Sequence, residues 1–235
     1  MALTFFSRCE SDTLDGTHDY SAGDTTWTLS SLVEFSTSGV KIGTNGLYTP
    51  GGDDYGVLAA TSILAPAAGT VAFWLRFDTY GAGSVLIEMA GTGGSDYIRL
   101  GTNYANGFEF RHRSSVGNNQ AISTSSITLT GSTWYFVQMH WSAALDSLHL
   151  SIHDSSGSLI EDVENTSAGL GAAMADMVEI RMGTQFGGAR VSIDNVFFGS
   201  AYADDFLSNR DITSYTGYGG GGASAPKRSL LLGIG

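Results

Sequence analysis

Carboxylates gather near the start of the sequence at a spacing that could support catalysis. The stretch contains Glu10, Asp12 and Asp15. Two carboxylates about 5–5.5 Å apart serve as nucleophile and acid/base in retaining glycoside hydrolysis. The alternative is that these acids are solvated in a loop, which is the usual situation for Asp and Glu.

Other acids could bind calcium. Asp53 and Asp54 follow two glycines, and Asp194 stands beside Asn195. Calcium takes about six to eight oxygen ligands, mostly from Asp and Asn side chains and loop carbonyls. The sequence contains no Asp-x-Asp-x-Asp-Gly loop, so the alternative is that Asp53 and Asp54 form a turn. Apart from this structural ion we expect no cofactor.

Basic and aromatic residues indicate a binding surface. Arg111 and Arg113 flank His112 in an acidic chain, so we expect this spot to contact an acidic glycan or a neighbouring subunit. The alternative is a solvated strand edge that discourages strand addition. Trp27 and Tyr104 fall outside the apolar runs and are expected to be free to stack on sugars or on protein.

Composition narrows the function classes. The 235 residues include 11 basic and 23 acidic side chains, a net charge of −12, which argues against nucleic acid and anionic membranes as partners. The single Cys9 rules out a disulfide framework. No apolar run approaches the ~20 residues that span a bilayer. No secretion signal precedes Cys9, so we expect synthesis in a cytoplasm.

Short alternating segments separated by Gly, Ser, Asn and Asp predict an all-β protein. With helices so scarce, the strands must pair antiparallel in two packed sheets. Helical turns are expected only at 170–177 and 202–209. The predicted strands are Leu3–Arg8, Ser31–Phe35, Thr70–Thr79, Ser84–Ala90, Tyr97–Gly101, Gly107–Arg113, Trp134–Trp141, Ser147–Asp154, Met177–Gly183 and Arg190–Gly199.

One hairpin can be aligned residue by residue. Matching the apolar faces of 134–141 and 147–154 pairs Trp141 with Leu148 and places His140 opposite His149. Two facing imidazoles resist double protonation, so low pH is expected to destabilise the pair. These histidines and His153 could form a metal cluster or a pH sensor, but the expectation is exposed residues on a sheet face.

Three segments resemble the concanavalin A-like (laminin-G-like) jelly-roll superfamily. Gly69–Asp78 is similar to its early core strand, Gly131–Trp141 to its Trp-started strand, and Val191–Phe198 to its closing strand. The resemblance implies two curved sheets whose concave face or rim loops bind glycans in lectin and glycosidase members, often beside a rim calcium. Glucanases of this fold carry a Glu-x-Asp-x-x-Glu-like motif, from which Glu10–Asp15 departs by ending in Asp and by lying outside the central sheet.

A second resemblance is to virion proteins of tailed bacteriophages, in which acidic, Gly/Ser-rich jelly rolls without a signal occur as capsid decoration or tail-associated modules. The features that carry this resemblance are the opening strand 3–8 and the Gly-rich linker that ends in Pro-Lys-Arg-Ser-Leu-Leu-Leu at residues 226–232. A late break in composition, where a Gly-rich stretch leads into a short basic and apolar tail, divides the chain into a jelly-roll domain 1–209, a Gly-rich linker 210–225 and a C-terminal docking arm 226–235. The residues expected to dock on a partner are Lys227, Arg228, Leu230, Leu231, Leu232 and Ile234.

The main interpretation is therefore a non-enzymatic structural protein of a virion. Its partners would be capsid or tail subunits in a symmetric oligomer, which the arm reaches at high effective concentration. The alternative is a lectin-like carbohydrate-binding module that uses its rim aromatics with Arg111 and Arg113. A retaining glycosidase is the third interpretation.

Overall fold

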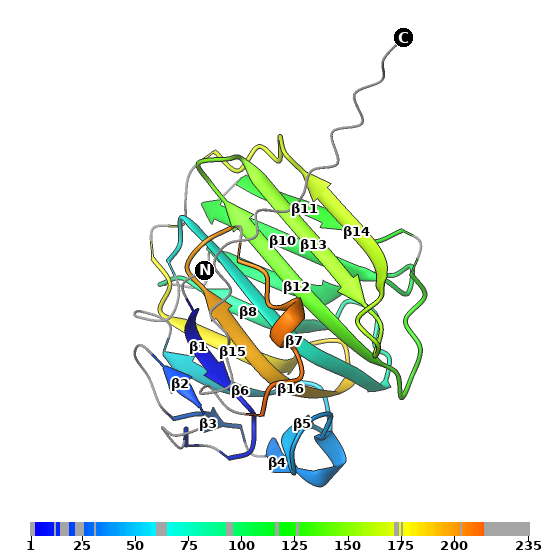
Figure 1. Ribbon diagram of the computed structural model, residues 1–235. Helices are drawn as coiled ribbons and strands as arrows, with labels where there is room; N and C mark the ends of the chain where they lie inside the picture. Colours follow the sequence, from blue (N-terminus) through cyan, green and yellow to red (C-terminus); the bar gives the residue numbers. More distant parts are fainter. Residues whose placement is uncertain are drawn as a thin grey trace.

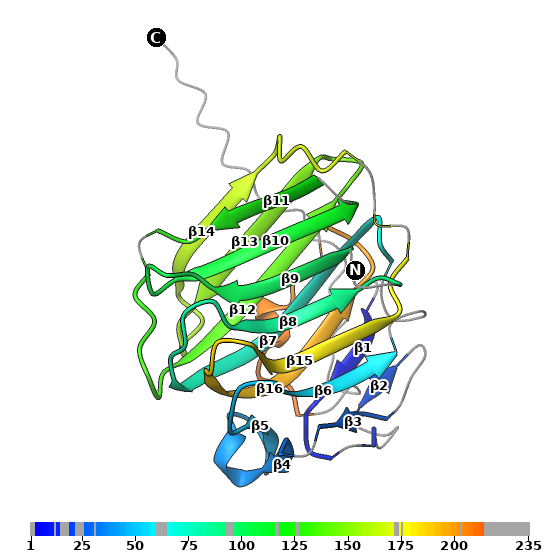
Figure 2. The same ribbon diagram turned by 180° about the vertical axis from the view of Figure 1, so that it is seen from behind.

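A computed structural model describes residues 3–213, except 12, 15–18, 22–25, 31, 60–64, 93–95, 116–117, 126, 172–173, 175 and 203. The described chain is an antiparallel sandwich of two sheets, seen from its two sides in Figures 1 and 2. The predicted all-β, two-sheet fold is confirmed. No helix in these ranges is long and apolar enough to cross a membrane.

The first sheet has nine strands. Its main path runs β14-β13-β12-β7-β16-β1-β2, and β5 joins β4 to β16 beside this path. The strands are β1 (Leu3–Ser7), β2 (Tyr20–Ser21), β4 (Glu34–Ser36), β5 (Gly46–Thr49), β7 (Ala68–Thr79), β12 (Trp134–Ser142), β13 (Ser147–His153), β14 (Leu159–Asn165) and β16 (Arg190–Gly199).

The second sheet has seven strands in the order β11-β10-β9-β8-β15-β6-β3. Its outer face is turned toward the viewer in Figure 2. The strands are β3 (Thr28–Leu29), β6 (Asp54–Ala59), β8 (Val85–Ala90), β9 (Tyr97–Thr102), β10 (Phe108–Ser115), β11 (Asn118–Ser123) and β15 (Glu179–Gln185).

Alternation along the strands builds the core between the sheets. On β7, Val71, Phe73 and Leu75 point inward and are fully buried, because successive side chains of a strand point to opposite faces. Fully burying one such side chain contributes about 1.5–3 kcal/mol. The second sheet supplies the facing residues, among them Leu100 and Phe110.

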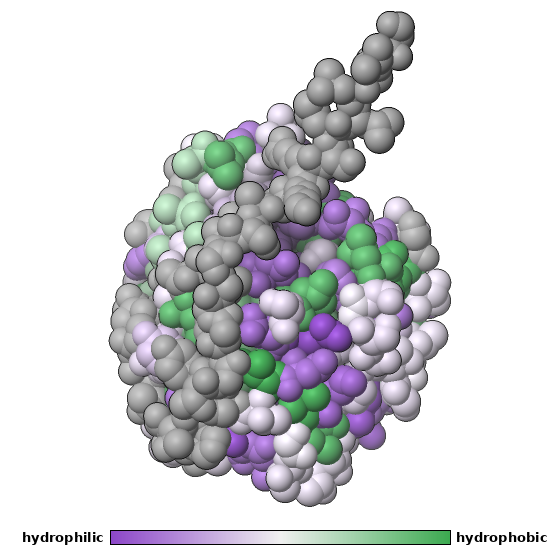
Figure 3. All heavy atoms as spheres, in the orientation of Figure 1, coloured by the Kyte–Doolittle hydropathy of each residue, from purple (hydrophilic) through white to green (hydrophobic). Residues whose placement is uncertain are grey.

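The nine-stranded sheet is covered on its outer face as well. Trp74, Phe136 and Phe197 lie on this face and form a second cluster with Phe206. Residues 200–213 run over the sheet there (Figure 1), and the Phe206 N–H donates to Gln138 Oε1 at 2.9 Å. The surface over this face mixes hydrophilic and hydrophobic residues (Figure 3). The first sheet is therefore an inner layer.

The predicted helical turns are mostly wrong. The described residues of 170–177 are irregular, although Leu170 is fully buried, and within 202–209 only Leu207–Asn209 forms a 3-10 turn, η2. A second 3-10 turn, η1, spans Thr37–Gly39. An apolar residue every third or fourth position matches a helix face, but tertiary packing of a loop buries the same residues. Contacts with the sandwich extend to Ile212, three residues beyond the expected domain end.

The aligned hairpin is confirmed in register. Trp141 pairs with Leu148 and His140 with His149, and the two imidazole rings stack with centroids 4.9 Å apart. The expected exposure is wrong for His140 and His153, which are 5% and 6% exposed. Tyr202 lies against His140, with ring centroids 6.0 Å apart. The Nδ1 of His140 lies 2.9 Å from Thr70 Oγ1 and 3.0 Å from the Tyr202 carbonyl oxygen. Burial, followed by the nearby His149, lowers the pKa of His140 to about 3.

Replacing His140 with Gln tests this burial. A folded-state pKa of about 3 lies below the ordinary 6.5, so the stability contributed by neutral His140 is complete above pH 6.5 and is lost as pH falls toward 3. We expect the free energy of unfolding of the wild type, relative to His140→Gln, to decrease by up to about 1.4 kcal/mol per pH unit below 6.5. Urea denaturation at pH 7.5, 6 and 5 measures the difference.

Burial also lowers the pKa of His112, to about 4. His112 is present in both proteins, so its contribution to the pH dependence cancels in the comparison. A difference between wild type and variant that stays constant from pH 7.5 to 5 would contradict a buried, neutral His140.

Candidate functional site

Three loops meet at one end of the sandwich. They are residues 80–84 between β7 and β8, 103–107 between β9 and β10, and 186–189 between β15 and β16, and we call them the rim. Antiparallel pairing brings them together, because β8 and β10 begin at the end where β9 and β15 finish. Figure 2 shows this end at the left of the seven-stranded sheet.

The rim contains a small pocket of about 220 Å³, open to solvent. Part of its lining is backbone without side chains, because Gly83 and Gly101 contribute to it. The polar walls come from strands β9 and β10 and the loop between them. The full lining consists of Gly83, Ser84, Val85, Arg99, Gly101, Thr102, Asn103, Tyr104, Glu109 and Arg111.

Tyr104 stands at the tip of the 103–107 loop and is 90% exposed. The loop beneath it is organised by Asn103, whose Oδ1 accepts the N–H groups of Ala105 and Gly107, both at 2.9 Å. Asn106 adopts a φ of 60°, a conformation that Asn tolerates better than most residues. The tyrosine ring is therefore presented to solvent by a hydrogen-bonded turn.

Arginines line the outer face of the seven-stranded sheet next to this loop. Arg181 pairs with Glu88, Glu88 with Arg99, and Arg99 with Arg111, so four charged residues cross four strands in one row. Arg113 lies two residues farther along β10 on the same face. An acidic chain thus concentrates four arginines on one sheet face.

The arginines at the pocket are only partly neutralised. Arg111 bonds to Glu109, and this hydrogen bond raises the pKa of Arg111 above its ordinary value. Arg99 lies over the Tyr97 ring, 4.3 Å from its centroid, and forms no ion pair with any residue that the structure describes. Arg99 and Arg111 face each other on neighbouring strands, and each also has a carboxylate beside it, with Glu88 opposite Arg99 and Glu109 bonded to Arg111.

The predicted contact residues divide into two groups. Tyr104 and Arg111 line one pocket, and Arg113 lies beside it with its guanidinium 5.8 Å from the Tyr97 ring centroid. The expectation for Trp27 is wrong, because it is 2% exposed and packs against Phe5. The edge interpretation of 111–113 is also wrong, since β10 pairs on both sides with β9 and β11.

The three calcium candidates each bond to protein groups at separate places. Asp53 Oδ1 accepts the Phe186 N–H at 2.8 Å, and Asp54 Oδ1 accepts the Ser30 hydroxyl at 3.3 Å. Within the ranges that the structure describes, no three Asp, Glu, His or Cys side chains gather as a metal-binding group. The calcium prediction therefore finds no ligand set in that part of the chain.

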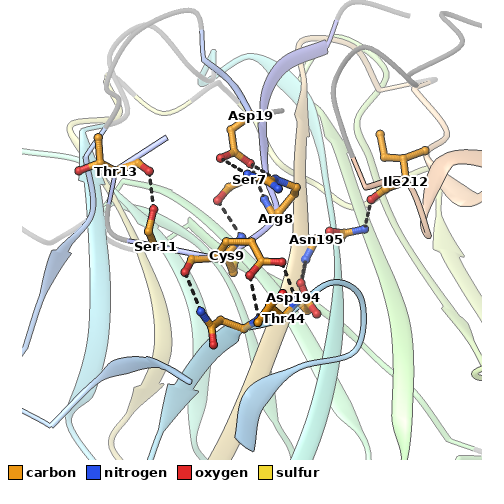
Figure 4. A network of polar contacts seen from close by, with 12 residues as sticks. Ser7, Arg8, Cys9, Ser11, Thr13, Asp19, Thr44, Asp194, Asn195 and Ile212 are labelled. Atoms are coloured by element: carbon orange, nitrogen blue, oxygen red, sulfur yellow. Dashed lines mark hydrogen bonds and ion pairs between the residues drawn. The ribbon is translucent and has the colours of Figure 1, made fainter. Parts of the chain in front are cut away.

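Asp194 belongs to a group of polar contacts on the outer side of the nine-stranded sheet, where it lies beside Asn195 (Figure 4). It is fully buried, and its carboxylate accepts the N–H groups of Lys41 and Ile42 at 2.6 and 2.7 Å. Burial raises its pKa to about 7, against the opposing effect of these N–H donors. Asn195 beside it donates to the Ile212 carbonyl at 2.8 Å, so the pair ties the final segment to the sheet.

Glu10, the first acid of the catalytic candidate, also bonds to the backbone. Its two oxygens accept the N–H groups of Thr44 and Asn45, both at 2.8 Å. Asp12 and Asp15 lie outside the described residues. Glu10 therefore holds the loop that follows η1 by hydrogen bonds to its backbone.

The docking arm, from Lys227 to Ile234, lies outside the described residues, as does the linker from residue 214. The assignment to a virion, the capsid or tail partners and the location in a virion depend on that segment. They stay predictions.

Sequence reasoning missed two residues that line the pocket and one residue of the rim. Arg99 alternates with buried Ile98 and Leu100 on β9, so its outward face could have been read from the pattern. Glu109 likewise alternates on β10. Phe186, 63% exposed in the 186–189 loop, carries no sequence signal beyond the two glycines that follow it.

The comparisons with known proteins agree with this architecture. Residues 50–152 match the family model of the concanavalin A-like lectin/glucanases superfamily, a stretch that contains β6 to most of β13. The fold is thus the concanavalin A-like jelly-roll sandwich. No curated protein matches the chain.

The similar solved structures are toxin binding domains. The binding domain of botulinum neurotoxin DC in complex with rat synaptotagmin II has a TM-score of 0.61 at 12% identity over 86% of this chain and 49% of its own. A botulinum neurotoxin type C structure, described by its interaction with two ganglioside molecules, has 0.60 at 11% over 86% and 49%. The neurotoxin DC domain in complex with SialylT has 0.56 at 14% over 82% and 46%.

This chain therefore spans about half the length of those structures. At such low identity the likeness establishes the fold alone.

Replacing Asn103 tests how the tyrosine loop is held. Asn103→Ala removes the acceptor for two backbone N–H groups, so we expect the free energy of unfolding to fall by about 1–2 kcal/mol. Asn103→Asp replaces the donor to the Phe108 carbonyl by a second oxygen but keeps the acceptor for both N–H groups, so we expect a smaller loss than for Asn103→Ala. Urea denaturation compares the two variants, and equal losses would contradict this account of the loop.

Proposed function

We propose that this chain is a non-catalytic, lectin-like module that binds an acidic glycan in the rim pocket. The observation that carries the proposal is the pocket itself, which joins the 90% exposed Tyr104 to the facing pair of Arg99 and Arg111. Sugar recognition needs a flat aromatic surface for the C–H face of the ring and convergent polar groups for its hydroxyls.

The pocket supplies both kinds of contact. Tyr104 provides the aromatic surface, Arg111 and Arg99 provide donors, and Glu109 provides an acceptor. At about 220 Å³ it is smaller than the roughly 300–1,000 Å³ of sites that enclose drug-sized ligands. Its size suits a single sugar ring held at the surface, with the rest of the glycan outside.

The acidic preference follows from the charge arrangement. Arg99 and Arg111 face each other on neighbouring strands, and a carboxylate or sulfate between two guanidinium groups relieves their repulsion while gaining charge-assisted hydrogen bonds. The structural neighbours, described with gangliosides, SialylT or a synaptotagmin, support recognition of a carbohydrate or receptor more than a capsid role.

Replacing Tyr104 with Ala tests the site. The exposed ring packs on little else, so we expect the free energy of unfolding to stay unchanged while glycan affinity falls about tenfold. A glycan array finds ligands for the wild type, and calorimetry then compares the variants. Leu145→Ala, an equally simple truncation of a 60% exposed residue in the β12–β13 loop at the opposite end, is the control and should bind like the wild type.

Replacing Arg111 with Ala tests the acidic preference. We expect binding of 3′-sialyllactose or a galacturonic acid trimer to weaken by about 10- to 100-fold, because a charge-assisted hydrogen bond contributes about 1.5–3 kcal/mol. Binding of neutral lactose, if measurable, should change little. An acidic preference that is kept in Arg111→Ala, or absent from the wild type, contradicts the role of the arginine pair.

A further inference from the structure

Phe186 is an exposed aromatic residue in a strained backbone conformation. It is 63% exposed and has a φ of 61°, in the left-handed region where a residue with a side chain costs roughly 1–2 kcal/mol. Asp53 holds it there, with Oδ1 accepting the Phe186 N–H at 2.8 Å. The hydrogen bond to Asp53 thus keeps Phe186 in a strained conformation with its apolar ring exposed to solvent.

The turn that carries Phe186 packs directly on the loop that lines the pocket. The Ala189 N–H donates to Ser84 Oγ at 3.3 Å. A Cβ on Gly81 would lie 2.4 Å from the Gly187 carbonyl oxygen, and one on Gly187 would lie 2.5 Å from Ser84 Oγ. Glycine is therefore required on both loops, because their backbones touch.

Tyr104 borders the same loop on its other side. A Cβ on Gly83 would lie 3.3 Å from the Tyr104 hydroxyl oxygen. Val85 pairs with Gly101 of β9 on one side and with Gln185 of β15 on the other. The ends of β9 and β15, just before the two aromatic residues, are therefore two strand spacings apart, roughly 10 Å.

Between the two aromatic residues the 80–84 loop presents mainly backbone. Gly81 and Gly83 have no side chains and Ala82 between them has only a methyl group, so no large side chain projects from residues 81–83. The backbone positions that lead into Tyr104 and Phe186, about two strand spacings apart and joined by a low ridge of peptide groups, leave room for a ligand longer than one sugar ring.

We propose that Phe186 is a second stacking surface of the glycan site, so that the ligand is an oligosaccharide that reaches from Tyr104 to Phe186. This inference rests on the proposed function of the pocket. One sugar occupies the pocket beside Tyr104, and a later sugar of the same chain lies on Phe186. The dependence on Phe186 must then appear only when the glycan is long enough.

The experiment measures affinity against glycan length. The probes are N-acetylneuraminic acid with 3′-sialyllactose, and galacturonic acid with its trimer and pentamer, titrated into the wild type, Phe186→Ala and Tyr104→Ala. We expect Phe186→Ala to bind the monosaccharides like the wild type and the longer member of the bound series about five- to tenfold more weakly. Tyr104→Ala weakens binding at every length, and Leu145→Ala at none.

Two companion variants separate binding from folding. Phe186→Tyr keeps an aromatic ring and should restore the affinity for the longer glycans. Phe186→Gly relieves the positive φ, so its urea midpoint should be equal to or higher than that of the wild type, while its glycan affinity falls like that of Phe186→Ala.

The outcomes distinguish the two proposals. A wild type that binds no probe overturns the proposed glycan site, and the role of Phe186 with it. Binding that depends on Tyr104 but is unchanged in Phe186→Ala at every length overturns the second stacking surface alone. A loss in Phe186→Ala that is equal at all lengths, or a lowered urea midpoint in Phe186→Gly, shows that the residue supports the loop instead.

Discussion

Burial of the nine-stranded sheet on both faces is the constraint on which the rest of the structure depends. Strands β7, β12 and β16 carry large apolar side chains on each side, such as Phe73 inward and Trp74 outward. One face packs on the second sheet, and residues 200–213 cover the other. The apolar side chains leave little polar surface on these central strands, and the recognition proposed above uses the outer face of the second sheet and the loops at its end.

The cover over the outer face also decides which buried polar groups are tolerated. Asn195 donates to carbonyls of the covering segment, and Gln138 accepts its Phe206 N–H. Burial beneath the same segment lowers the pKa of His140 to about 3, so its imidazole stays neutral at ordinary pH. Buried polar groups are stable when they are hydrogen-bonded, so these contacts let the last segment close over the sheet without leaving charges in the core.

The outer face of the second sheet, in contrast, carries charged side chains. Arg99, Arg111 and Arg181 alternate with buried apolar residues and share their charge with Glu88 and Glu109. The net charge of −12 makes this arginine face stand out locally, which no count over the whole chain reveals. The rim lies at one end of this face, where loop backbones touch and only glycine fits. Hydrogen bonds to Asn103 and Asp53 fix the backbone of the loops that carry Tyr104 and Phe186, which limits the backbone entropy lost on binding.

Alternation of apolar and polar residues by itself determined the all-β class, the antiparallel pairing and the register of the 134–153 hairpin, because the period of two specifies which side chains share a face. Charge and position outside the apolar runs singled out Arg111 and Tyr104 as candidate contact residues. Only the tertiary structure decided that Trp27 is buried, that His140 is covered, that Arg99 and Glu109 line the pocket, and that Phe186 lies in the rim. The reason is that burial and proximity across strands depend on which distant segments pack together, and residues 53, 84, 104 and 186 meet only after the sheets have formed.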